Sequence, residues 1–144
     1  MNNDKEELLE LYKIMIDSIN SNESKRLQTN IMYTTIISAL IAIISSGLVG
    51  LNLSLISTVI LFLSISWYVH IFTYRKLAQA KFEVINELEK NFLVPIYAKE
   101  WNYYKKISPK IEQTLIEMGI PIVIGTLSVC YIVYRIFLYF YKVL

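Results

Sequence analysis

The sequence predicts an all-α integral membrane protein with three transmembrane helices, a helical hairpin plus a third span, and a helical cytoplasmic layer. Of its 144 residues, 55% are hydrophobic and only 18% are charged, and the mean hydropathy is +0.45. A soluble domain of this size needs a polar shell over most of its surface. So few charges do not supply such a shell, and the length leaves room for one domain at most.

Residues 1–30 are predicted to form an amphipathic helix on the cytoplasmic side of the membrane. Its apolar side chains recur at helical spacing, as at Leu8, Leu11, Met15 and Ile19. Helices that lie flat among lipid headgroups usually carry a basic polar face. Because this segment holds more acidic than basic residues, we expect it to pack against protein.

Residues 31–73 are predicted to form a transmembrane helical hairpin. The 48 residues from Leu27 to Tyr74 include no Lys, Arg, Asp or Glu, and one span needs only about 20 apolar residues. Two glycines and an asparagine near the middle of this run favour a tight reversal. We therefore expect the two spans at about 31–49 and about 53–73.

Small residues spaced four apart form a stripe in the first span: Thr34, Ser38, Ala42, Ser46 and Gly50. Small residues at this interval let two backbones approach closely, and in lipid such packing replaces the missing hydrophobic drive for association. We expect this small-residue stripe to pack against another helix. The alternative is that its hydroxyl groups line a wet lumen, which would select poorly among ions without charged rings.

Residues 74–117 are predicted to form a cytoplasmic helical segment. The helix of the second span should continue into it, because apolar and charged side chains alternate with a helical period. Pro95 is expected to end this helix at about residues 92–94. Its charged face, with Arg75 at one end and Glu87 further along, could pair with a neighbouring copy of the chain.

Residues 118–144 are predicted to form the third transmembrane helix, because only Arg135 and Lys142 interrupt this apolar run. Pro121 cannot donate a hydrogen bond to the carbonyl group of Glu117. We therefore expect a hinge at Pro121, near the membrane surface.

The distribution of charge predicts the orientation of the spans. Segments 1–30 and 74–117 hold 12 basic residues, whereas the hairpin turn holds none. By the positive-inside bias, both segments and the N-terminus are cytoplasmic, and three spans place the C-terminus outside. The same segments hold all 12 acidic residues. This balance argues against nucleic acid as a partner, because nucleic acid requires clustered positive charge.

The reactive side chains form no catalytic set. His70 could sense pH, since histidine titrates near neutrality, but an interfacial histidine bonded to a neighbour is the simpler interpretation. Cys130 has no nearby histidine and is expected to pack in apolar surroundings. Glu87, Glu89 and Glu100 lie among lysines and are expected on a solvated or ion-paired face. We therefore expect no enzyme activity, no metal, no cofactor and no small-molecule substrate.

Aromatic side chains gather where the cytoplasmic headgroups are expected. Such clusters are typical of the aromatic belts that anchor membrane proteins at the two surfaces of a bilayer. The residues concerned are Trp67, Tyr68, Tyr74, Trp101, Tyr103 and Tyr104.

Three stretches carry a resemblance to a known family. They are Leu11-Tyr12-Lys13 with Lys25-Arg26 and Asn30, the run WYVHIFTYRKLAQAKFEVINELEKNFLVPIYAKEW from Trp67 to Trp101, and Glu117 with Ile120-Pro121. Together they resemble the RipA-like family of small bacterial inner-membrane proteins, which are described as octameric. The resemblance implies a homo-oligomeric ring but no known activity. Residues of the motif that we expect at the subunit interface are Trp67, Tyr74, Arg75, Lys81, Phe82, Glu87, Glu89 and Trp101.

These observations lead to one expected function and one rival. We expect a homo-oligomeric, octameric protein of the bacterial inner membrane that acts as a scaffold or a pore, with the lipid bilayer and its own copies as partners. The rival is a membrane-perturbing effector like the SLATT modules of nucleotide-signalled anti-phage defence systems. A nucleotide-synthase gene beside this one would favour the rival.

Overall fold

The computed structural model describes residues 2–46, 53–90, 95–107 and 113–143. These residues form four α-helices and no strand: α1 (Asn2–Ser45), α2 (Leu53–Glu89), α3 (Ile96–Ile107) and α4 (Gln113–Val143). Three of them, α1, α2 and α4, are long and apolar enough to cross a membrane. The predicted all-α class with three spans is therefore confirmed.

The two helices of the hairpin extend well beyond a membrane. With 44 residues, α1 joins the predicted amphipathic helix and the first span into one helix, about 66 Å long at 1.5 Å per residue. The hydrocarbon core of a bilayer is about 30 Å thick. Likewise α2 continues past the apolar run, as predicted, but it ends at Glu89, before the expected end at about residues 92–94, which lie outside the described residues. We call the projecting parts, residues 2–26 of α1 and 75–89 of α2, the stalk.

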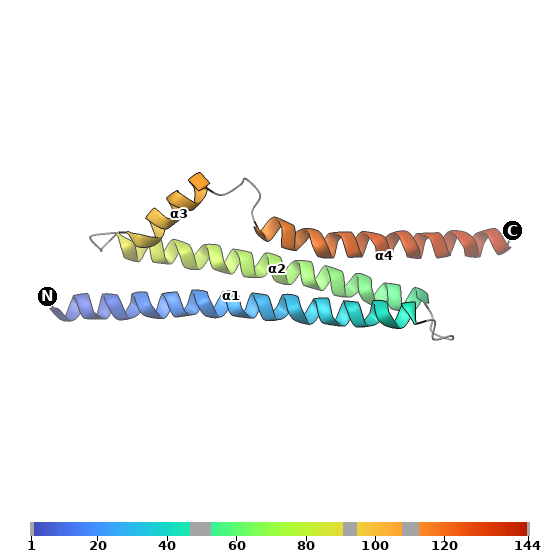
Figure 1. Ribbon diagram of the computed structural model, residues 1–144, viewed down its shortest axis with the longest axis horizontal. Helices are drawn as coiled ribbons and strands as arrows, with labels where there is room; N and C mark the ends of the chain where they lie inside the picture. The colour runs from blue at the N-terminus through green and yellow to red at the C-terminus, as the bar shows by residue number, and fades with distance from the viewer. Residues whose placement is uncertain (1, 47–52, 91–94, 108–112, 144) are drawn as a thin grey trace.

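The long helices lie in a row, with α2 in the middle (Figure 1). On one side of α2 lies α1, and on the other lies α4, each antiparallel to α2. The short helix α3 begins beside the end of the stalk and points back toward the start of α4. In this row α1 and α4 occupy opposite edges of the subunit.

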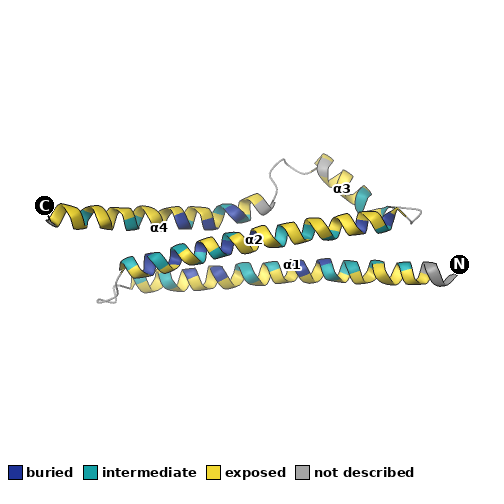
Figure 2. Cartoon of the chain, turned by 180° about the vertical axis from the view of Figure 1, so that it is seen from behind, coloured by how far each residue is buried: buried dark blue, intermediate teal, exposed yellow. Residues whose placement is uncertain are grey.

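The core lies along the surfaces where the helices of this row meet, and the outward faces are largely exposed (Figure 2). Bulky side chains of α1 pack against the middle of α2, and one side chain of α4 joins them. In lipid, the exposed apolar faces carry no free-energy penalty, because lipid tails and not water surround them. The buried cluster consists of Tyr33, Ile37, Ile56, Ile60, Trp67, Ile71 and Met118.

The small-residue stripe of α1 does not form the hairpin contact. Thr34, Ser38, Ala42 and Ser46 are all exposed on the face turned away from α2, and Gly50 lies outside the described residues. Packing of the stripe against another copy stays a prediction.

Small residues do bring α2 and α4 close together. A Cβ atom added at Gly125 of α4 would lie 3.5 Å from the Cβ atom of Ser64 in α2. Ser64, Pro121 and Ser128 are buried at this contact. Helix α4 continues through Pro121 without a break. A hinge at Pro121 stays a prediction.

Candidate functional site

The candidate site is a polar network at the level where the charge-free run begins, where α1, α2 and α4 meet. Helix α1 presents three members on one face, since they are four and three residues apart. Helix α2 contributes three members, and α4 contributes one. The network consists of Arg26, Asn30, Tyr33, Ser66, Trp67, His70 and Glu117.

The inner half of the network is built around Tyr33. Its ring stacks on Trp67, with the centroids 5.8 Å apart and the planes 9° apart. Its hydroxyl group lies 2.7 Å from Ser66 Oγ and 2.8 Å from His70 Nδ1. Trp67 is 3% exposed, and its Nε1 donates to Asn30 Oδ1 at 2.8 Å. These bonds satisfy polar groups that would be costly to bury unpaired in a membrane.

The outer half of the network ties the start of α4 to α1. Asn30 Nδ2 donates to Glu117 Oε2 at 3.4 Å, and Arg26 Nε lies 3.7 Å from the same oxygen. A carboxylate next to hydrocarbon is unfavourable unless it is paired. Asn30 therefore connects both halves, because its amide oxygen accepts from Trp67 while its amide nitrogen donates to Glu117.

A second polar cluster lies at the far end of the stalk, around Glu89. Its Oε1 accepts from Tyr12 Oη at 3.0 Å and from the Tyr97 amide at 2.8 Å, and its Oε2 accepts from the Ala98 amide at 3.2 Å. These amides belong to the first turn of α3, so Glu89 caps that helix. Burial, and then the Glu89 carboxylate, raise the pKa of Tyr12 to about 12. The expected solvated or ion-paired face was wrong for Glu89, which is 2% exposed.

Further bonds join α1 to α2 along the stalk. Lys81 Nζ donates to the Ser18 carbonyl at 2.7 Å, and Asn22 Nδ2 donates to the Tyr74 carbonyl at 3.5 Å. The Tyr74 hydroxyl group lies 3.4 Å from Thr29 Oγ1. In each of these bonds, a side chain of one helix is bonded to an atom of the other helix, so the bonds fix the register of the hairpin.

The motif residues expected at the subunit interface divide into two groups. Trp67, Tyr74, Lys81 and Glu89 make the bonds within the chain described above, and Trp67 lies in the core instead of an aromatic belt. The others are less enclosed. Phe82 contacts the Tyr97 ring at 6.1 Å but is exposed, Glu87 and Trp101 are exposed, and Arg75 is half-buried.

His70, Cys130 and the carboxylates were the other reactive side chains considered from the sequence. His70 is exposed and hydrogen-bonded to Tyr33, as expected for a histidine bonded to a neighbour, and its place at the membrane interface stays a prediction. Cys130 is exposed on the apolar helix α4 of the single chain, so its packing in apolar surroundings stays a prediction. Among the described residues, no three His, Cys, Asp or Glu side chains lie close enough to share a metal ion.

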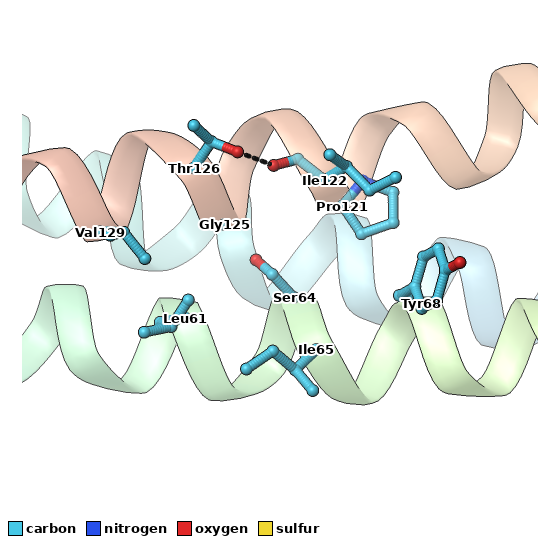
Figure 3. A pocket seen from close by; sticks show the side chains of 9 residues that line it. All are labelled: Leu61, Ser64, Ile65, Tyr68, Pro121, Ile122, Gly125, Thr126 and Val129. Carbon is cyan, nitrogen blue, oxygen red and sulfur yellow. Dashed lines mark hydrogen bonds between the residues drawn. The ribbon is translucent and has the colours of Figure 1, made fainter.

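A shallow groove of about 380 Å³ runs between α2 and α4, beside the Ser64–Gly125 contact (Figure 3). Leu61, Ile65, Tyr68 and Val129 are among its lining residues. The hydroxyl group of Thr126 is hydrogen-bonded within its own helix, where it donates to the Ile122 carbonyl at 2.8 Å. The groove therefore offers hydrocarbon contact and few polar groups for orienting a substrate.

Sequence reasoning did not predict the network as a site, although Arg26, Asn30, Trp67 and Glu117 all lie in the stretches that carry the family resemblance. The sequence does show that each of these residues lies near an end of an apolar run, where a polar side chain needs a hydrogen-bond partner. The pairing itself depends on which helix faces meet, and no local pattern shows that.

The chain matches one family in the comparisons with known proteins. The sequence profile of the Octameric membrane protein family (8xMP) matches residues 9–139, a range that includes every member of both polar clusters. No curated protein and no solved structure matches the chain significantly.

Proposed function

The chain belongs to the octameric membrane protein family, and from this membership we propose that it assembles as an octamer of identical subunits and acts as a scaffold in the bacterial inner membrane. Apolar surface on the stalk is the observation that carries the proposal. Leu9, Leu11, Ile14 and Val84 are exposed there, and the first three lie far along the chain from the charge-free run. Lipid tails do not reach that part of the stalk, so neighbouring copies are suited to cover it.

The row of helices suits a closed ring. In a ring of identical chains, each copy uses two different faces, because one copy's first face meets the next copy's second face. The α1 edge and the α4 edge are two such faces. On the α1 edge, the small-residue stripe is exposed and would allow close approach by a helix of the next copy.

The hydroxyl groups on the α1 edge favour a scaffold over a water-filled pore. Thr34 Oγ1 donates to the Asn30 carbonyl at 2.8 Å, Ser45 Oγ to the Ile41 carbonyl at 2.9 Å, and Ser46 Oγ to the Ile43 carbonyl at 2.8 Å. Each of these hydroxyl groups already donates its proton to a backbone carbonyl group of the same chain. These residues can therefore face lipid or another helix without leaving a donor unpaired. In the proposed role the protein carries out no catalysis.

Native mass spectrometry of the detergent-solubilised protein tests the assembly. The proposal expects a mass of about eight times 16.8 kDa. Ala42→Leu adds bulk on the stripe and should shift the population to smaller species, whereas Ala42→Ser keeps the residue small and should leave the octamer intact. A monomer in wild type would contradict the octamer. An intact Ala42→Leu octamer of unchanged thermal stability would contradict the stripe as its interface.

Vesicles that contain a trapped dye separate the scaffold from the pore and from the membrane-perturbing effector. We expect vesicles reconstituted with the protein to retain the dye as well as protein-free vesicles do. Release of the dye in proportion to the amount of octamer would overturn the scaffold role and favour the rival functions.

A further inference from the structure

Helix α3 begins beside the far end of the stalk, well outside the membrane. Its first turn is fixed there, because the rings of Tyr97 and Tyr12 have their centroids 6.4 Å apart and Glu89 caps the helix. Tyr12 lies 15 residues before Leu27, where the charge-free run begins, or about 22 Å along α1 at 1.5 Å per residue. The headgroup layer beyond the hydrocarbon core is only about 5–8 Å thick. Lipid therefore does not cover the first turns of α3.

The face of α3 that is turned away from the stalk is basic, and we call it the outward face of α3. At 100° per residue, Lys99 and Lys106 lie on the side of the helix opposite Tyr97. Both lysines, with Tyr103, are among the residues that line a shallow hollow of about 230 Å³. Tyr103 is 64% exposed beside them, and Ile107 is 82% exposed. The helix contains three lysines and one glutamate, so its net charge is positive.

The face of α1 that is turned away from α2 carries the opposite charge in this part of the stalk, and we call it the outer face of α1. Ile19 is buried against α2. Asp17 precedes it by two positions and Glu10 precedes Asp17 by seven, so at 100° per residue both acids point away from α2. Both are exposed, and Ile14 between them is 55% exposed. Residues 6–17 hold four acidic residues and one lysine, so this part of α1 is net acidic.

The two faces match in spacing as well as in charge. Lys99 and Lys106 are seven residues apart, and so are Glu10 and Asp17, which is about 10 Å along each helix. Helices α1 and α3 both run from the end of the stalk toward the membrane side (Figure 1). The two lysines can therefore meet the two acids in the same order along the stalk. Among the described residues, none of these four side chains takes part in an ion pair.

We propose that the outward face of α3 binds the outer face of α1 in the next copy of the chain, with the two lysines paired with the two acids. The inference rests on the proposed octamer. In a ring all copies lie at the same height, and α1 and α3 lie on opposite sides of α2 (Figure 1), so the α3 side of one copy meets the α1 side of the next. The contact also covers apolar side chains that lie outside the membrane, such as Ile107 and Ile14.

Crosslinking tests the contact directly. In a Cys130→Ala background, Lys106→Cys and Asp17→Cys are combined in one full-length chain, and the detergent-solubilised protein is treated with a short bifunctional maleimide. We expect a ladder of linked chains on a denaturing gel, because each copy offers one cysteine to the copy before it and the other to the copy after it. Either cysteine alone should give no linked chains. Glu23→Cys in place of Asp17→Cys is the matched control and should give no ladder, because it lies six residues nearer the membrane and about a third of a turn around α1.

Charge reversal tests the ion pairs. An exposed pair strengthens an association by up to about fivefold, and reversal replaces this attraction with repulsion at every interface of the ring. Lys106→Glu should therefore raise the protein concentration at which half of the octamer dissociates by about fivefold or more, with a larger effect at low salt than at high salt. Adding Asp17→Lys should restore assembly. Adding Glu23→Lys, which gives the same net charge, should not.

The outcomes separate this contact from the octamer itself. An intact octamer that gives no ladder and does not respond to Lys106→Glu would overturn the contact alone, and α3 would then face a partner other than its own copies. Dissociation by Lys106→Glu that Asp17→Lys fails to reverse would overturn the pairing of these two residues. A monomer in native mass spectrometry of the wild type would contradict the octamer, and the contact with it.

Discussion

At the residue scale, single polar side chains connect helices that pack mainly through apolar surface. Asn30 of α1 is hydrogen-bonded to Trp67 of α2 and to Glu117 of α4, so one amide group links all three long helices. Glu89 of α2 links α1 and α3 in the same way, because it is hydrogen-bonded to Tyr12 of α1 and to the first amides of α3. Apolar surfaces can slide past one another, whereas hydrogen bonds between named atoms allow one register.

Replacing Glu89 tests this role at the end of the stalk. Glu89→Ala should lower the free energy of unfolding by about 1–2 kcal/mol, because it leaves the capped amides of α3 without an acceptor. Hydrogen exchange should accelerate at the amides of Tyr97 and Ala98, while the α1–α2 core keeps its protection. Glu89→Gln, which retains one acceptor oxygen, should have a smaller effect. Unchanged exchange in α3 for Glu89→Ala would show that the cap is dispensable.

The contact between Tyr12 and Glu89 also predicts a pH dependence. The pKa of Tyr12 is raised to about 12, first by burial and then by the Glu89 carboxylate, from an unfolded value of about 10. The folded chain therefore holds this proton more tightly. Its contribution to stability is fully present below about pH 10 and is lost as the pH rises to about 12. Denaturation measured across this range should show a steeper decline for wild type than for Tyr12→Phe, and lysine titration largely cancels in the difference. Parallel curves would contradict the contact.

At the element scale, α4 packs on α2 through small residues, and this contact can be tested with a matched pair of glycines. An added Cβ atom at Gly125 meets Ser64 at 3.5 Å and Leu61 at 3.8 Å, whereas one at Gly119 meets nothing within 4 Å. Gly125→Leu should push the two helices apart and lower the free energy of unfolding by about 1–3 kcal/mol.

Gly119→Leu serves as the control and should be neutral or slightly stabilising, because leucine favours a helix more than glycine does. Gly125→Ala should be tolerated as well, since 3.5 Å is an ordinary van der Waals contact. Thermal unfolding of the three variants in one detergent gives the comparison. Equal effects of leucine at both positions would mean that α2 and α4 do not approach closely at Gly125.

The helices themselves could be predicted from the sequence, because a long charge-free run and a helical period are local properties. Which face of α1 meets α2 could not be predicted in this way. Small-residue spacing favours Ala42 and its neighbours, yet the core uses Tyr33 and Ile37. Tyr33 is suited to the core because Ser66 and His70 meet its hydroxyl group, and only the paired helices bring those atoms together. The cap that Glu89 provides for α3 could not be predicted either, because it depends on where the fold places the first turn of α3.

At the scale of the whole molecule, we infer that one boundary of the membrane lies at the level of the polar network. Thr29 of α1 is bonded to Tyr74 of α2, and Asn30 is bonded to Glu117 of α4, so three helices reach the same level there. About 20 residues of helix cross the hydrocarbon core. Counting about 20 residues from each boundary residue places the opposite surface at about position 54 in α2 and 137 in α4, and at about position 50 of the chain, beyond the end of α1 at Ser45. The first and last values agree with the hairpin turn between α1 and α2.

The same counting supports a topology in which the N-terminus is cytoplasmic and the C-terminus lies outside. Arg135 lies about two residues inside the outer surface and can extend its guanidinium group to the headgroups, while Lys142 lies beyond that surface. Helix α4 also extends, at its C-terminal end, past the end of α1 and the start of α2 (Figure 1). Three spans place the two termini on opposite sides, and from the 12 basic residues before the third span we predict that the N-terminal side is cytoplasmic.

Cysteine labelling of intact cells tests this orientation in the full chain. In a Cys130→Ala background, a membrane-impermeant maleimide should label Asn52→Cys and Leu144→Cys, because the predicted topology places both positions outside. It should label Lys106→Cys only after the cells are opened, since that site lies on the basic side of the membrane. Labelling of Lys106→Cys in intact cells, with Asn52→Cys protected, would invert the topology. Labelling of Asn52→Cys but not Leu144→Cys would mean that α4 does not cross the membrane, and the boundary at Glu117 would then have to be abandoned.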